Sequence, residues 1–153
     1  MSYLDEFQSN SNWIKDKVDK DTVDFARRFA AYLVESFKGN AQKGIKGVFE
    51  LKTNQLRKFF GAVKNFQLKA QLTDVFNESE FIMLKPKLAY AVGRVKQQHK
   101  NEEIRIKDFA DVISKAIDYV IESNNKEKAF KNFVNFFEAI VAYHKQEENN
   151  LNK

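Results

Sequence analysis

Residues 126–146 read KEKAFKNFVNFFEAIVAYHKQ, and this stretch decides the fold. Its apolar residues recur at steps of three and four, which is the spacing of a helix. The stripe consists of Phe130, Phe133, Val134, Phe137, Ile140 and Val141, and it is widened by Phe136, Ala139 and Tyr143. A helix that is apolar almost around its circumference is normally central in a bundle. We therefore predict an all-α fold, a single compact helical bundle of about five helices.

The same periodicity predicts four more helices around the central one. They are expected over residues 21–38, 53–76, from about Pro86 through Val95, and 107–122. Their buried stripes are predicted to include Phe37 in the first helix, Leu56, Phe59, Val63, Phe66 and Ala70 in the second, and Leu88, Val92 and Val95 in the third. Thr53 is the expected N-cap of the second helix, and Asn124 with Glu127 has the spacing of a capping box before the last one.

The segments between and beyond these helices read as loops and ends. Residues 39–52 contain three Gly and three Lys without clear periodicity, which predicts a loop with exposed charge. Asn101, Glu102 and Glu103 are expected to end the third helix. Residues 1–18 are predicted to be an N-terminal extension or a short docking helix, and residues 147–153 a frayed tail, so that residues 1–153 form one domain.

Composition narrows the class of protein further. The 153 residues contain no Cys, which excludes disulfides and thiolate-rich metal sites. The N-terminus lacks the pattern of a signal peptide, and no segment approaches the roughly 18 apolar residues of a membrane span. We expect a cytoplasmic protein that is not associated with a membrane and needs no cofactor.

Positive charge is concentrated in the middle of the chain. Residues 38–107 contain 15 Lys and Arg against 6 Asp and Glu, whereas the rest contains 11 against 15. Clustered Lys and Arg favour a polyanionic partner, because neutralised phosphates release their counterions.

Two basic stripes follow from the helical wheel. In the helix that starts at Thr53, the residues Asn54, Arg57, Gly61 and Lys64 share a face, with Lys58 beside it. The Thr53 hydroxyl and the first free amides of the helix would add anion-binding capacity. A mid-helix Gly61 costs about 1 kcal/mol relative to Ala, which indicates either that a bulky sugar-phosphate chain approaches there or that another helix packs closely. The alternative for the charges is a solvated outer face.

In the helix near Pro86, the residues Lys87, Ala91, Arg94 and Gln98 share a stripe, and Lys85 lies just ahead of Pro86. Lys87 and Arg94 lie two turns apart and can contact separate phosphates of one backbone. The alternative for Arg94 is a structural ion pair with Glu138, because a carboxylate in a largely apolar stripe needs a partner.

Three stretches make the chain recognisable: TNQLRKFFGAV (residues 53–63), LKPKLAYAVGRV (84–95) and FVNFFEAIVAYHK (133–145). In order and spacing they resemble the signature stretches of the small subunit of the type III-A CRISPR effector, the Csm interference complex. The resemblance covers about residues 49–145, and the first 48 residues match less clearly. The residues that match basic positions of the family motifs are Arg57, Lys58, Lys85, Lys87 and Arg94.

The resemblance implies a non-catalytic RNA-binding subunit with a role in antiviral defence. Its implied partners are the duplex of guide RNA and target RNA, the backbone subunits, the large polymerase-like subunit, and further copies of itself stacked as a minor filament. Because such a complex must accept any target, contacts to the RNA backbone suit it better than base reading. Together with the stripes, the RNA-binding candidates are Arg57, Lys58, Lys64, Lys85, Lys87 and Arg94.

Other functions find less support in the sequence. His99 and His144 have no carboxylates at ligand spacing, which favours surface or half-buried histidines over metal ligands. The segment GNAQKGIKG lacks the ending of a phosphate-binding loop. Most Phe residues fall on core-facing stripes, and Phe49, Phe60 and Phe81 are the candidates for base stacking. The rival hypothesis is a helical adaptor whose basic face docks an acidic protein.

Overall fold

The structure is a computed structural model that describes residues 2–151. The elements follow one another in the order α1 (Tyr3–Gln8), α2 (Asn12–Lys15), α3 (Lys20–Leu33), the 3-10 helix η1 (Ala41–Lys43), β1 (Gly47–Phe49), α4 (Thr53–Thr73), α5 (Glu78–Ile82), α6 (Leu84–Gln98), β2 (Glu102–Ile104), α7 (Arg105–Glu122) and α8 (Lys126–Leu151). The long helices α3, α4, α6, α7 and α8 are the five that the sequence predicts. The all-α prediction is therefore confirmed, with the short helices α1, α2 and α5 added to it.

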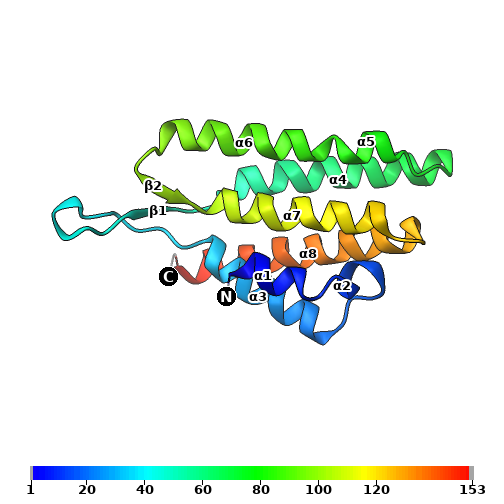
Figure 1. Cartoon of the computed structure of the whole chain (residues 1–153), viewed down its shortest axis with the longest axis horizontal. Helices are drawn as coiled ribbons and strands as arrows, with labels where there is room; N and C mark the ends of the chain where they lie inside the picture. The colour runs from blue at the N-terminus through cyan, green and yellow to red at the C-terminus, as the bar shows by residue number, and fades with distance from the viewer. Residues whose placement is uncertain (1, 152–153) are drawn as a thin grey trace.

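The helix α8 lies in the middle of the bundle and packs against α2, α3, α4 and α7 (Figure 1). Its Phe136 is fully buried and stacks on Phe7 of α1, with ring centroids 5.1 Å apart. Its Phe133 meets the ring of Phe81 of α5 at 5.4 Å, edge to face. Contacts with helices from the N-terminal and the middle parts of the chain make α8 the centre of the core, as its sequence predicts.

The N-terminal segment docks onto this core as two short helices. The side chains of Phe7, Trp13 and Ile14 are buried. The amide of Asn132 on α8 donates to the carbonyl oxygens of Ile14 and Asp16, each at 3.0 Å. The structure thus has two short packed helices where the sequence suggested an N-terminal extension or a short docking helix.

The far end of α8 differs from the prediction. The helix continues to Leu151, so residues 147–151, expected to be a frayed tail, are helical, and residues 152–153 lie outside the described residues. Glu148 in this extension accepts a hydrogen bond from the Thr53 hydroxyl, and the buried His144 ring bonds the Leu51 carbonyl at 2.9 Å. The end of α8 therefore fixes the start of α4. The ring of His144 is buried, not exposed or half-buried as expected.

Residues 37–48 form a projecting arm, where a helix end and a loop were expected (Figure 1). α3 ends at Leu33, five residues before the predicted Lys38, and the arm folds back on itself through antiparallel bridges between Phe37 and Val48 and between Asn40 and Ile45. Phe37 is 49% exposed instead of lying on a buried helical stripe. The helix prediction failed because Phe37 continues the apolar spacing of α3, although its backbone already pairs with Val48 and is no longer helical.

Close approach of the two sides of the arm explains Gly39, and a left-handed backbone conformation explains Gly44. A Cβ atom on Gly39 would lie 2.5 Å from the backbone nitrogen of Gly47, closer than a side chain allows. Gly44 at the tip has a φ of 68°, in the left-handed region that favours glycine. The glycines of this segment therefore specify a tight ladder and not a flexible loop.

The base of the arm is tied to the bundle by a short parallel sheet. β1 pairs with β2, with Val48 opposite Glu103, where the sequence indicated only a helix end. Beside the sheet, the Arg105 guanidinium lies 3.8 Å from the centroid of the Tyr32 ring and donates to its hydroxyl at 2.9 Å. Burial raises the pKa of Tyr32 to about 12. The arm is thus anchored on α3 and α7.

The remaining differences concern helix caps and edges. Lys52 is the N-cap of α4 and Thr53 its first residue, and the side chain that caps α8 belongs to Asn125, which accepts from the Lys128 amide at 3.1 Å, and not to Asn124. Ala70 and Val92 are half-buried. The other predicted core residues of α4 and α6 are buried.

None of the helices between residues 2 and 151 is long and apolar enough to cross a membrane.

Candidate nucleic-acid interface

An open groove of about 690 Å³ separates α4 from α6. It exists because the two helices rest on different supports: α4 packs against α8, whereas α6 packs against α7 and α5. Each helix turns its buried stripe toward its own support, which leaves the sides that face each other only partly covered. The groove follows the long axis of the bundle, since both helices run in that direction (Figure 1).

The walls of the groove come from one face of each helix. The lining residues are Gln55, Lys58, Phe59 and Ala62 of α4 and Pro86, Lys87, Tyr90, Ala91, Arg94, Val95 and Gln98 of α6. Within each helix these positions recur at steps of three and four, so they lie on one side of the cylinder. The sequence therefore builds the groove from the positions beside the two buried stripes.

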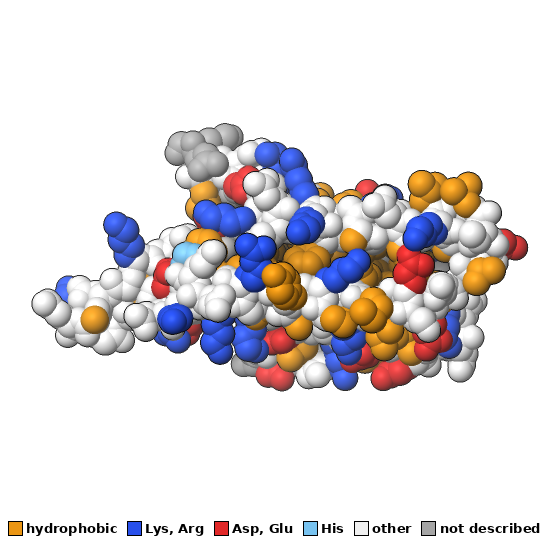
Figure 2. All heavy atoms as spheres, turned by 90° about the horizontal axis from the view of Figure 1, so that it is seen from above, with side chains coloured by type: hydrophobic (Ala, Val, Ile, Leu, Met, Phe, Trp, Pro, Cys, Tyr) orange, Lys and Arg blue, Asp and Glu red, His pale blue; other side chains and the backbone are white. Residues whose placement is uncertain are grey.

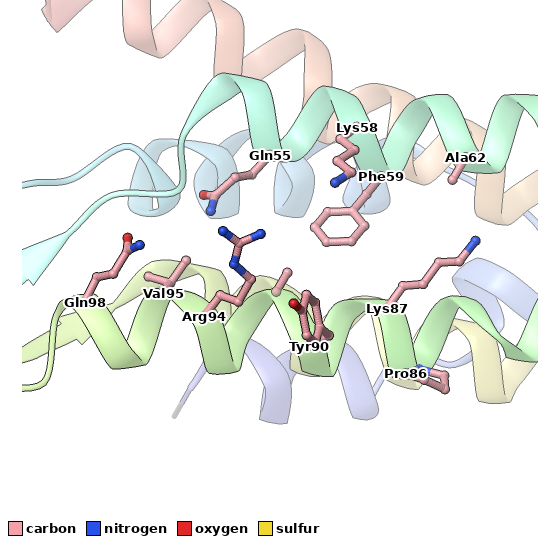
Figure 3. A pocket seen from close by; sticks show the side chains of 11 residues that line it. Gln55, Lys58, Phe59, Ala62, Pro86, Lys87, Tyr90, Arg94, Val95 and Gln98 are labelled. Atoms are coloured by element: carbon pink, nitrogen blue, oxygen red, sulfur yellow. The ribbon is translucent and has the colours of Figure 1, made fainter.

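Three cations meet in this groove. Figure 3 shows Lys58 pointing from α4 toward α6, and Lys87 and Arg94 pointing from α6 toward α4. No carboxylate is among the lining residues, and the floor is apolar, with Phe59 and Val95 nearly buried. In the space-filling view, blue side chains surround an orange hollow on this face (Figure 2). Uncompensated positive charge above an apolar floor suits an elongated, negatively charged ligand.

The other three candidates lie outside the groove. Arg57 and Lys64 are exposed on a different face of α4, and the Lys64 ammonium lies 5.8 Å from the centroid of the Phe60 ring. Lys85 forms an ion pair with Asp118 of α7 at 2.6 Å. The predicted stripe of Arg57 and Lys64 thus shares no surface with Lys58, and the RNA contacts of these three residues stay predictions.

The predicted alternative for Arg94, an ion pair with Glu138, is wrong. Glu138 is exposed on α8 and not part of a buried stripe, and none of the ion pairs within residues 2–151 involves Arg94. The nearest aromatic partner of its guanidinium is the Tyr90 ring, with 6.0 Å between the guanidinium carbon and the ring centroid. The charge of Arg94 is consequently available in the groove.

Two expectations about α4 also change. A Cβ atom on Gly61 would meet nothing within 4 Å, so the hypothesis that this glycine lets another helix pack closely is wrong for the isolated chain. The Thr53 hydroxyl is engaged by Glu148, whose carboxylate would repel an anion there. The expected anion-binding capacity at the start of α4 is therefore absent.

The aromatic residue that sequence reasoning missed is Tyr90. Of the three Phe candidates, Phe81 is fully buried, Phe49 stacks on His99 with centroids 3.7 Å apart, and Phe60 is half-buried against Phe137. Tyr90 is 69% exposed and lines the groove. The signal in the sequence is its position between Lys87 and Arg94 on one helical face, which none of the three Phe candidates shares.

Within residues 2–151, no three His, Cys, Asp or Glu side chains are grouped so as to hold a metal ion. His99 is half-buried, with Nδ1 2.7 Å from Glu102 Oε1, and His144 holds the Leu51 carbonyl. Both histidines thus have partners in the fold.

The fold and the groove define a small all-α protein that presents an open basic groove along a helical bundle. A family model described as Csm2 Type III-A matches residues 20–150. The chain belongs to this family, and it is a small subunit of the type III-A CRISPR effector, the Csm complex. The match includes the segment before residue 49, where the resemblance was less clear. A comparison with curated proteins found no match, and neither did a comparison with solved structures.

Proposed function

We propose that this chain is a non-catalytic, cytoplasmic RNA-binding subunit that holds the backbone of target RNA paired with guide RNA in the groove between α4 and α6. The observation that carries the proposal is the convergence of Lys58, Lys87 and Arg94 in one open groove that no carboxylate lines. Phosphates bound by Lys and Arg carry no sequence information, which suits a complex whose specificity resides in base pairing.

The two ends of the molecule support stacking of several copies into a filament. The arm contains Lys38, Lys43 and Lys46 without an acidic residue between positions 37 and 48, and Phe37 and Ile45 are exposed there. At the opposite end of the bundle, α4 and α5 meet in a surface that combines acidic and exposed apolar side chains (Figure 1). These are Asp74, Glu78 and Glu80, and Leu72, Val75, Ile82 and Met83.

Opposite charges and exposed apolar residues at the two ends favour a head-to-tail contact, which does not close on itself and therefore propagates. Because the groove runs along the same axis, stacked copies would join their grooves into one basic track. A single copy makes few phosphate contacts, and the array gains affinity through effective concentration. Substituting Leu72→Asp should abolish association between copies in sedimentation experiments and leave the groove intact.

The experiment that tests the RNA proposal is a titration of the purified protein with single-stranded RNAs of several sequences and with guide–target duplexes at two salt concentrations. Backbone binding predicts affinities that tolerate sequence and a logarithm of affinity that falls linearly with the logarithm of salt concentration. Binding that depends on sequence, or that salt leaves unchanged, would contradict it.

A second candidate, a helical adaptor for an acidic protein, is favoured by one observation, the apolar floor of the groove at Phe59 and Val95. An amphipathic helix with acidic flanks would bury its apolar face on such a floor. The second function replaces the first if two results are found together. No RNA binds even within the reconstituted complex, and an acidic amphipathic peptide binds the wild-type protein but not the Arg94→Ala variant.

A further inference from the structure

Tyr90 is the large aromatic side chain that the groove leaves open. It is 69% exposed, although it lies in the middle of the lining. On α6 it follows Lys87 by three residues and precedes Arg94 by four, so that the three side chains share one side of the helix. Figure 3 shows the Tyr90 ring between the Arg94 and Lys87 side chains, which both extend toward α4.

The Tyr90 side chain makes few contacts within the fold, unlike three other tyrosines. The hydroxyl groups of Tyr3, Tyr32 and Tyr119 donate to Arg28, Asp108 and Gln8, and their rings pack in the bundle. Within residues 2–151, the Tyr90 hydroxyl has no hydrogen-bond partner, and the nearest group described for its ring is the Arg94 guanidinium, 6.0 Å away. With 69% of its surface exposed, the ring is thus largely open to a ligand that enters between the helices.

The spacing of the cations fits a ligand with alternating phosphates and rings. Seven residues separate Lys87 from Arg94, which corresponds to about 10.5 Å along a helix. Phosphates held at the two positions leave room for a nucleotide between them, whose base would meet the Tyr90 ring. Stacking on an aromatic ring is tolerant of base identity, and a neighbouring guanidinium strengthens it.

We propose that Tyr90 is a stacking platform for one unpaired nucleobase of the strand whose phosphates contact Lys87 and Arg94. This inference rests on the proposed RNA-binding function of the same groove and adds a ligand class to it. A base inside a continuous duplex has both faces covered by its neighbours, so it cannot stack on the ring. The groove is therefore selective for a strand with at least one nucleotide turned out of the helix.

The test compares two oligoribonucleotides of equal length, one with all its bases and one with abasic residues at its centre, by fluorescence anisotropy with the full chain. Wild-type protein should bind the strand with bases about tenfold more tightly than the abasic strand. Tyr90→Phe keeps the ring and should preserve this ratio. Tyr90→Leu keeps apolar volume without a ring, and should reduce the ratio to near one. Val23→Ala, an exposed apolar residue of α3 that belongs to neither the groove nor the stacking surfaces, is the control that should retain it.

The outcomes separate the stacking inference from the proposal beneath it. If wild-type protein binds both strands equally in a salt-dependent way, backbone binding stands and the stacking inference fails. The same holds if Tyr90→Leu preserves the ratio. If wild-type protein binds neither strand, the proposed function fails and the stacking inference fails with it.

Discussion

The helices α8 and α6 use their side chains in opposite ways. α8 contacts helices on several sides, and its buried residues include Phe130, Phe133, Phe136 and Phe137. α6 rests on α7 and α5, buries only Leu84, Leu88 and Val95, and leaves a basic face open toward α4. Because the aromatic side chains of α8 fill the core, α6 can remain partly uncovered. The Phe-rich packing around α8 determines how the helices are arranged, and incomplete packing at the edge of the bundle creates the groove.

The largest expected effect is on stability at α8. Phe136→Ala should lower the free energy of unfolding by about 3–5 kcal/mol, because it removes a fully buried ring and leaves a cavity beside Phe7 and Phe25. Chemical denaturation with urea measures this loss. Tyr90→Ala in the groove is the contrast and should change the free energy by less than about 0.5 kcal/mol. Similar losses of unfolding free energy at the two positions would contradict the distinction between the packed core around α8 and the open groove.

The second prediction concerns Arg94 on α6. Arg94→Ala should weaken RNA binding about fivefold and reduce the salt slope by about one, because one phosphate contact is lost. The melting temperature should stay the same, since Arg94 has no carboxylate partner among residues 2–151. Lys69→Ala is the matched control, because it removes one positive charge from α4 at an exposed pair with Glu80 outside the groove. A lower melting temperature with unchanged RNA binding would make Arg94 structural.

A smaller effect is expected at Gly93 of α6. A Cβ atom there would meet nothing within 4 Å, so Gly93→Ala should raise the free energy of unfolding by about 0.5–1 kcal/mol through helix propensity alone. Thermal and urea denaturation measure the gain. A loss of stability would mean that the face of α6 at Gly93 is covered, contrary to the comparison with α8.

The smallest effect is a pH dependence at the N-terminal helices. The hydrogen bonds from Arg28 hold the pKa of the Glu6 carboxyl below its ordinary value, with Arg28 Nη1 3.0 Å from Glu6 Oε1. A lowered pKa means that the pair stabilises the fold above the ordinary pKa of a glutamate, and that this contribution disappears as the pH falls through the lower, folded-state value. Glu6→Gln should cost less than about 1 kcal/mol at pH 7. The difference in melting temperature from the wild type should shrink toward pH 3, and a constant difference would contradict the assignment.

The arrangement of helices around α8 could be predicted from the sequence because the buried residues recur with the period of a helix. In α8 each buried Phe recurs at helical spacing, and no other secondary structure accounts for such a run. The arm could not be predicted in the same way, since Phe37 continues the apolar spacing of α3 while its backbone pairs with Val48 eleven residues later. Pairing between distant residues leaves no periodic mark in a sequence.

The lining of the groove was predicted only in part, because it depends on contacts between helices. The helical wheel placed Lys87 and Arg94 on one face correctly, because that face depends on α6 alone. Which face of α4 turns toward α6 depends on how α4 packs on α8, and this choice put Lys58 into the groove and left Arg57 and Lys64 on another face. The partner of Lys85, Asp118, lies on a different helix and was equally hidden from a wheel.

The central claim is that the groove, and not the outer face of α4, contacts RNA. It is tested most directly by measuring the salt dependence of RNA affinity for two double variants, Lys58→Ala with Arg94→Ala and Arg57→Ala with Lys64→Ala, which remove the same charge. The groove variant is predicted to lose about two units of the log–log salt slope, and the outer-face variant much less. An equal or greater loss in the outer-face variant would contradict the account.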